Sequence, residues 1–204
     1  MIGRLAIVVV IAGCALATKS PPIELHYYTL APPASANLER PPSRARLRLG
    51  RVFAAGHLGS AIVHRDSDVE LAPYETLRWA ESPEVYARRA LVHAVFEARP
   101  IDQATVGGAR TLDVEVVSFE EVARAAGHAG RVELRYELRD DRDVIARGTA
   151  CAERAASSDR IEAIVAAIDR ALDAASADLA DQIGRALGMS DGDSAAVRAR
   201  PRDQ

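Results

Sequence analysis

The chain has 204 residues, of which 49% are hydrophobic and 27% are charged, a composition typical of one globular domain with tails. Its 26 basic and 29 acidic residues give a net charge of -3 and are interspersed, which excludes a basic stripe for nucleic acid. The two cysteines, Cys14 and Cys151, form neither a disulfide framework nor a CxxC metal site, so no metal or other cofactor is expected.

The N-terminus has the pattern of an export signal. Arg4 precedes an apolar run over residues 5–12, and small residues then lead to a cysteine. Crossing a bilayer takes roughly 20 apolar residues, and Lys19 and two prolines follow too soon for that length. We therefore expect residues 1–13 to be a cleaved signal peptide.

Residues 11–14, with the sequence IAGC, resemble the lipobox of bacterial lipoproteins. Such a motif is cleaved between Gly13 and Cys14, and the cysteine thiolate accepts diacylglycerol. An ordinary signal peptide with an incidental cysteine and a buried N-terminal strand are the alternatives. Several acyl chains, each contributing about 0.8 kcal/mol per buried CH₂, would anchor the protein firmly. Ala15 stands where an aspartate would resemble an inner-membrane retention signal, which favours the outer membrane.

The first half of the mature chain predicts short strands. Residues 14–23 contain two prolines and are expected to form a lipidated tether, followed by a strand over 25–30 and a proline-bearing stretch over 31–44. Leu47, Leu49 and Phe53 alternate with arginines, with Val52 breaking the pattern, which predicts a strand that buries these three side chains on one face. Residues 61–63 and 69–71, separated by a polar turn over 64–68, are typical of a hairpin.

A helix is predicted between Ser82 and Arg99. Ser82 is expected to cap it, Pro83 fits its first turn, Glu84 complements the helix dipole, and Pro100 ends it.

Three strands are expected next. Leu112, Val114 and Val116 alternate with acidic residues, and residues 131–139, beyond a loop with a glycine-containing turn, alternate strictly between charged and apolar. A turn over 140–143 then leads to a partner strand over 144–153, which predicts an antiparallel hairpin.

From Ser158 the apolar residues recur at helical spacing until Leu187, and Gly188 can end this long amphipathic helix. Residues 189–204 are polar and are expected to be a disordered tail. The order of strands, helix, strands and helix predicts an α+β fold. It would be a single small domain over residues 24–188, with an antiparallel or mixed sheet packed against two helices.

No catalytic motif is visible in the sequence. The GxSxG, HExxH and P-loop spacings do not occur, and Gly107 and Gly108 lack the pattern that cradles a pyrophosphate. Cys151 lies in an expected strand, and we predict that it is a small buried residue rather than a reactive thiol. We expect no enzyme. The five histidines are separated along the chain: His26, His57, His64, His93 and His128.

Two stretches carry a family resemblance. Residues 27–30 (YYTL) follow soon after the lipobox, and residues 74–83 read YETLRWAESP. Together with the order of the elements over about residues 24–188, they resemble the ABC-type transport auxiliary lipoproteins. Trp79 lies in the second stretch and is a candidate contact for a partner or lipid, although packing in the core is the alternative.

The resemblance implies a non-enzymatic component of an intermembrane lipid transport system. Its partners would be an MCE-domain protein and an ABC permease and ATPase, with phospholipid as a candidate ligand and assembly of several copies left open. The chain would be anchored to the outer membrane by lipid on Cys14, facing the periplasm. A structural lipoprotein that escorts an outer-membrane β-barrel or another envelope component is the alternative, and a lipid-anchored periplasmic enzyme is a third reading.

Overall fold

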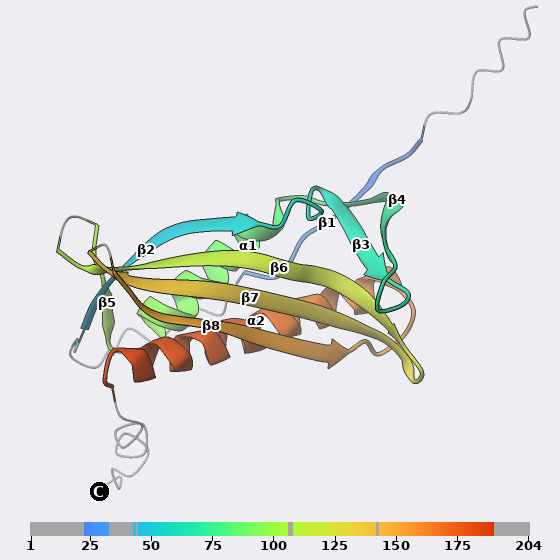
Figure 1. The fold of residues 1–204 in the computed structure, drawn as a ribbon. Coiled ribbons are helices and arrows are strands. Elements are labelled where there is room, and N and C mark those ends of the chain that lie inside the picture. The colour runs from blue at the N-terminus through green and yellow to red at the C-terminus, as the bar shows by residue number, and fades with distance from the viewer. Residues whose placement is uncertain (1–22, 33–42, 44, 106–107, 142, 190–204) are drawn as a thin grey trace, which may run out of the picture.

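The computed structural model describes residues 23–32, 43, 45–105, 108–141 and 143–189, and three long strands organise it (Figure 1). β6 (Arg110–Arg124) pairs antiparallel with β7 (Gly127–Asp140), which pairs antiparallel with β8 (Asp143–Ala155). Val132, Leu134, Tyr136 and Leu138 on β7 are buried, while the charged residues between them are partly or fully exposed. The alternation predicted for 131–139 and the hairpin that follows it are therefore confirmed.

The other side of β6 is shared by two strands in tandem. β2 (Ala45–Ala54) pairs parallel with its first half and β3 (Ala61–Arg65) pairs parallel with its second half. β4 (Leu71–Trp79) forms an antiparallel hairpin with β3, and β1 (His26–Tyr28) pairs parallel with β4. The short strand β5 (Ile101–Gln103), which the sequence did not predict, pairs parallel with β2. The described residues thus form one mixed sheet of 8 strands.

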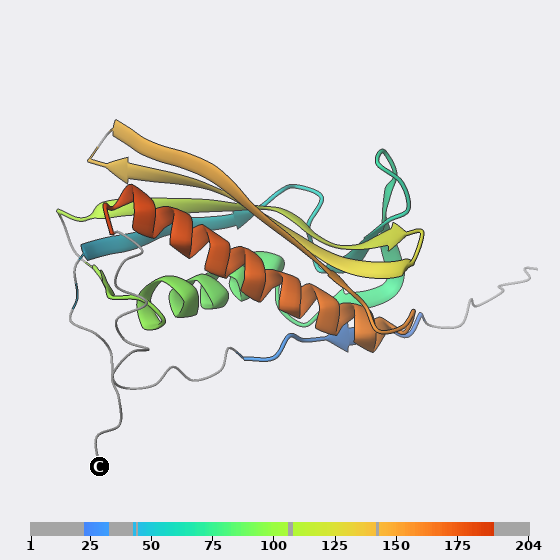
Figure 2. The same ribbon diagram turned by 90° about the horizontal axis from the view of Figure 1, so that it is seen from below.

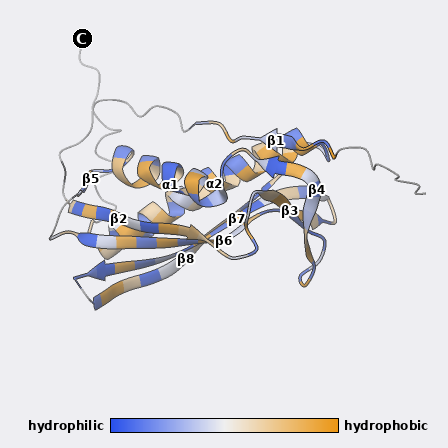
Figure 3. Cartoon of the chain, turned by 90° about the horizontal axis from the view of Figure 1, so that it is seen from above, coloured by the Kyte–Doolittle hydropathy of each residue, from blue (hydrophilic) through white to orange (hydrophobic). Residues whose placement is uncertain are grey.

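Helices cover one face of this sheet (Figure 2). α1 (Pro83–Leu91) continues into a π-helical turn, η1 (Val92–Glu97), and α2 (Ile161–Ala186) lies across β6, β7 and β8. The predicted apolar stripe of α2 is buried in the core, and the hydropathy colouring alternates along the strands (Figure 3). The prediction of a small α+β domain with a mixed sheet against two helices is confirmed. No described helix is long and apolar enough to cross a membrane.

α2 ends as the sequence predicted. Gly188 has a φ of 76°, and the N–H of Met189 donates to the carbonyl of Gly184 at 2.9 Å, which is the hydrogen bond of a Schellman cap. Met189 packs against the core, so assigning it to a disordered tail was wrong. The rest of that predicted tail, 190–204, lies outside the described residues.

The first helix differs from its prediction at both ends. Pro83 begins it as expected, but the Ser82 side chain makes no capping hydrogen bond, and the N–H of Val85 donates to the backbone carbonyl of Ser82 at 2.9 Å. At its other end the helix widens into the π-turn, and the N–H of Ala98 donates to the carbonyl of His93 at 2.9 Å. The helical structure therefore ends at Glu97, two residues before the predicted end.

Phe53 is the clearest error in the predicted core. Leu47 and Leu49 are buried as expected, but the β2–β6 register shifts between Leu49 and Val52, and Phe53 is 44% exposed. A bulge adds a residue to one strand and reverses the faces beyond it. Phe53 therefore points to the face that carries no helix.

Two strands also have different limits from those predicted. β4 begins at Leu71, so Val69 lies in the preceding loop, where it is 94% exposed. β6 runs on to Arg124 through residues 117–124, where a loop was expected. Phe119, Glu120 and Glu121 in this part are all buried, so both faces are covered and the alternation that marks a strand disappears.

A glycine fixes the distance between α2 and the sheet. A Cβ added at Gly130 on β7 would lie 2.2 Å from the backbone nitrogen of Ile168 and 2.5 Å from the carbonyl carbon of Ala167. Gly130→Ala should therefore push the helix off the sheet and lower the free energy of unfolding by about 3 kcal/mol. Urea denaturation of the variant measures this loss. Gly56→Ala is the control, because a Cβ there meets nothing within 4 Å, and equal stabilities would contradict the close-packing role.

Candidate functional site

The face of the sheet opposite the helices is hollowed into a groove of about 320 Å³. Its lining residues come from β2, β6, β7 and β8. Charged side chains dominate its lining, together with the ring of Phe53, which the bulge in β2 turns outward. The lining residues are Arg51, Phe53, Asp113, Val114, Glu115, Arg135, Tyr136, Glu137, Arg139 and Arg147.

Most charges of the groove are paired across neighbouring strands. Arg135 Nη1 donates to Glu115 Oε2 at 3.1 Å, and Arg147 Nε donates to Glu137 Oε2 at 3.0 Å. Arg139 contacts the other oxygen of Glu137. Hydrogen bonds from Arg139 and Arg147 lower the pKa of Glu137, so this carboxylate stays charged. The lining contains four arginines and three acidic residues, which gives the groove a net charge of +1 (4 − 3).

The bulge in β2 shapes one end of the groove. Asp113 Oδ1 accepts a hydrogen bond of 2.7 Å from the backbone N–H of Arg51. The same oxygen would lie 2.4 Å from a Cβ at Gly50, so a side chain at this position would push Asp113 aside. The Arg51 guanidinium lies 5.9 Å from the centre of the Phe53 ring. This end of the groove therefore presents a cation and an aromatic surface together.

A second polar cluster lies near the far end of β6, where two buried glutamates occupy adjacent positions. Arg65 on β3 donates to Glu120 at 2.8 Å and 3.3 Å, and the Glu120 side chain is fully buried. Tyr74 Oη donates to Glu121 Oε2 at 2.6 Å, and His128 Nδ1 lies 2.5 Å from Glu121 Oε1. Burial, and then the adjacent Glu121, raise the pKa of Tyr74.

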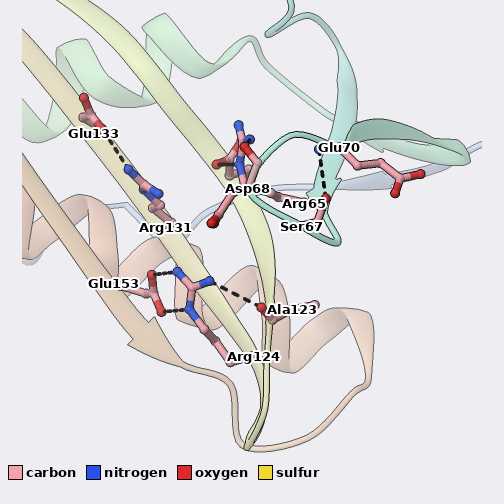
Figure 4. Close-up of polar contacts among 10 residues, drawn as sticks. Arg65, Ser67, Asp68, Glu70, Ala123, Arg124, Arg131, Glu133 and Glu153 are labelled. Atoms are coloured by element: carbon pink, nitrogen blue, oxygen red, sulfur yellow. Dashed lines mark hydrogen bonds and ion pairs between the residues drawn. The ribbon is translucent and has the colours of Figure 1, made fainter.

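The outer surface beside this cluster carries further ion pairs (Figure 4). Arg124 donates to both oxygens of Glu153, at 2.7 Å and 2.5 Å, and this hydrogen bonding lowers the pKa of Glu153. Arg131 donates to Glu133 at 2.9 Å. Each acid of the cluster thus has a basic or hydroxyl partner, and the arrangement holds strands together rather than leaving a carboxylate free to act as a base.

Sequence reasoning missed both clusters. The groove forms only when outward residues of four strands come together, and no local motif marks it. The paired glutamates at 120 and 121 lie in the stretch interpreted as a loop. A charged pair inside the apolar context VSFEEVA was the one available signal.

The predicted site residues fall in different places. Trp79 is 2% exposed, with its ring centre 5.9 Å from that of Tyr86 and 5.1 Å from that of Phe119, which is the core position. A contact between Trp79 and a partner or lipid stays a prediction, since the side chain would have to be uncovered. Gly13 and Cys14 lie outside the described residues, as does Gly107.

Cys151 was wrongly expected to be buried. It is a free, exposed thiol on β8, directly opposite Glu133. Ala150 and Ala152 face the core instead, so the cysteine between them must point to the outer face.

Three histidines of the described residues each contact a different carboxylate, and they do not form a cluster with one another. His64, His93 and His128 contact Asp66, Glu97 and Glu121 respectively. In the described part of the chain, no group of three or more His, Cys, Asp or Glu could hold a metal ion.

A family model described as "ABC-type transport auxiliary lipoprotein component" matches residues 28–180. The chain belongs to this family. It is therefore an auxiliary lipoprotein of an ABC-type transport system and a component of the cell envelope, as the resemblance of residues 27–30 and 74–83 implied. No curated protein matches the chain.

Solved structures support the fold of this transport auxiliary lipoprotein. A protein from Xanthomonas campestris, XCC0632, is 24% identical with a TM-score of 0.68, covering 83% of this chain and 99% of its own. An uncharacterized protein is 19% identical with a TM-score of 0.60, covering 78% and 99%. The hypothetical protein CT253 from Chlamydia trachomatis is 6% identical with a TM-score of 0.52, covering 72% and 100%. These likenesses show a shared fold.

The buried pair of Arg65 and Glu120 makes a testable contribution to this auxiliary lipoprotein. Arg65→Met leaves the buried Glu120 carboxylate without its cation and should lower the free energy of unfolding by about 3–5 kcal/mol. Arg65→Met combined with Glu120→Leu removes both charges and should recover most of that loss. Urea denaturation of the two variants gives both values. A double variant as unstable as the single one would show that the loss does not come from an uncompensated charge.

Proposed function

We propose that this chain is a non-enzymatic adaptor of an MCE-type ABC system that moves lipid between the inner and outer membranes. It is anchored in the outer membrane by lipid on Cys14, and its domain faces the periplasm. The single observation that supports this most directly is the match of residues 28–180 to a family of ABC transport auxiliary lipoproteins. The MCE partner comes from the resemblance stated above, and the membrane from Ala15 after the lipobox cysteine.

The groove is the surface through which we expect the adaptor to contact the MCE-domain protein. Phe53 is 44% exposed at one end, and four arginines are among the lining residues. Arginine and aromatic residues are enriched at the energetic centres of protein interfaces. The cation of Arg51 beside the ring of Phe53 has this character, and a groove of mixed charge suits a polar protein surface better than an acyl chain.

The anchor is tested by labelling cells with a palmitate analogue. The wild-type chain and Cys151→Ala should take up the label and fractionate with the outer membrane. Cys14→Ala should take up none, because the lipid-accepting thiol is gone. Cys151→Ala is the matched control, since it removes the other cysteine. Label retained in Cys14→Ala, or wild type found in the inner membrane, would contradict the anchor or its location.

The partner is tested by affinity purification from detergent-solubilised envelope, followed by mass spectrometry. Wild type should bring down the MCE-domain protein with the permease and ATPase, whereas Phe53→Asp should reduce their yield roughly tenfold or more. Val69→Asp is the control, because Val69 is 94% exposed and does not line the groove.

The possible outcomes separate the two parts of this proposal. If wild type recovers the transport subunits and Phe53→Asp recovers them equally, the adaptor role stands and the groove is not the contact. If wild type instead recovers an outer-membrane β-barrel protein without transport subunits, the adaptor role is wrong and the envelope-assembly alternative replaces it.

A further inference from the structure

β8 is a long edge strand. It has 13 residues and pairs with β7 along one side, and no other described strand pairs with its second side. It forms the border of the sheet next to α2 (Figure 1). An edge of this length is a template for another strand unless proline, lysine or a bulge blunts it. β8 contains no proline or lysine, and its register shift against β7 lies near its first residues, at Leu138/Arg139.

The hydrogen bonds show which backbone groups of β8 face outward. Gln182 Nε2 donates to the carbonyl of Thr149 at 3.3 Å, and Arg170 Nη2 donates to the carbonyl of Ala155 at 3.0 Å, both from α2. By contrast, the N–H of Ala156, just after the strand, donates to the backbone carbonyl of His128 on the β7 side at 2.8 Å. The odd-numbered residues of β8 therefore point their backbone groups to the free edge.

The outward side chains of β8 are complementary to the same side chains of a second β8 that runs antiparallel to it. Arg147, Thr149, Cys151 and Glu153 are exposed, and Ala150 lies at their centre, facing the core. If a second β8 runs antiparallel with Ala150 opposite Ala150, Arg147 lies opposite Glu153 and Thr149 lies opposite Cys151, twice each. Centring the pair on Thr149 places Arg147 opposite Cys151, and centring it on Cys151 places Glu153 opposite Thr149. Of these three registers, the one centred on Ala150 matches both charges.

We propose that β8 pairs antiparallel with β8 of a second copy of this chain, about a twofold axis at Ala150. The two sheets then become one continuous sheet, with α2 of each copy on the same face. This dimer is a property of the domain beyond the proposed transport role, and it can form whatever the transported substrate is.

The charges already present extend across this junction without rearrangement. Within one chain, Glu137 lies opposite Arg147, and Arg131 lies opposite Glu153. In the dimer a single row therefore reads Glu137, Arg147, then Glu153 and Arg131 of the second copy, with the sign alternating at every step. Opposite charges on facing residues stabilise a strand pair, and like charges destabilise it. Gln182 need not leave, because a carbonyl oxygen has two lone pairs and can accept a second hydrogen bond.

Disulfide trapping of the full-length chain in the cell envelope tests the register. Thr149→Cys places a thiol directly opposite the native Cys151 of the second copy, within bridging distance for facing residues. Under mild oxidation most of this variant should run as a dimer on a non-reducing gel. Wild type, and Thr149→Cys combined with Cys151→Ser, should form at least fivefold less, because their remaining thiols sit about 7–8 Å apart on the diagonal.

Charge reversal provides the second measurement, on the full-length chain in detergent by sedimentation. Arg147→Glu should weaken the dimer at least tenfold, and Arg147→Glu with Glu153→Arg should restore it to within about threefold, since the two facing pairs between the copies regain opposite signs. Arg110→Glu is the matched control, because Arg110 pairs with Asp140 and not with any residue of β8. The proposal is overturned if Thr149→Cys gives no dimer, if removing Cys151 leaves the dimer unchanged, or if the double reversal fails to restore what the single one loses.

Discussion

The close packing of α2 on β7 and β8 is the constraint on which the rest of the molecule depends. Gly130 lets the helix backbone approach the sheet, and alanines at 167, 171 and 175 keep the contacting side of the helix narrow. At this distance Ile168 and Leu172 reach the sheet and contribute roughly 1.5–3 kcal/mol each through burial. One face of the sheet is therefore buried in the core, and the opposite face can carry charged side chains.

The outer face owes its organisation to the same alternation. Every second residue of β6, β7 and β8 must point away from α2. On β7 these positions alternate between arginine and glutamate, and several of them pair with charged residues of β6 or β8. The bulge at Gly50 adds the one aromatic side chain that the regular pattern would have buried. Groove and free edge are therefore consequences of one arrangement, a three-stranded antiparallel sheet covered by a helix on a single side.

Elements with one buried and one exposed face could be predicted from the sequence. Elements that are buried on both faces could not. Residues 131–139 alternate because one face meets α2 and the other meets water, and α2 itself shows an equally clear stripe. Residues 117–124 are covered on both faces, so Glu120 and Glu121 were interpreted as a loop, and their partners Arg65 and Tyr74 lie far away in sequence. Cys151 could have been placed correctly, because a strand that buries Ala150 and Ala152 must expose the residue between them. The bulge that exposes Phe53 involves Asp113, a residue of another strand, and its only local sign is Val52, which breaks the alternation.

The magnitudes separate the two kinds of ion pair in this domain. Arg65 and Glu120 are an internal pair, where loss of one partner costs several kcal/mol, so this contact belongs to the stability of the fold. Exposed pairs such as that of Arg147 and Glu137 are screened by solvent and contribute little to stability, too little to explain rows of them across three strands. Such rows instead determine which partner surface can pack against the outer face and in which register. A shift of the partner by two residues would bring like charges or unmatched groups together. The outer face of this lipoprotein is therefore better suited to selecting partners than to holding the domain together.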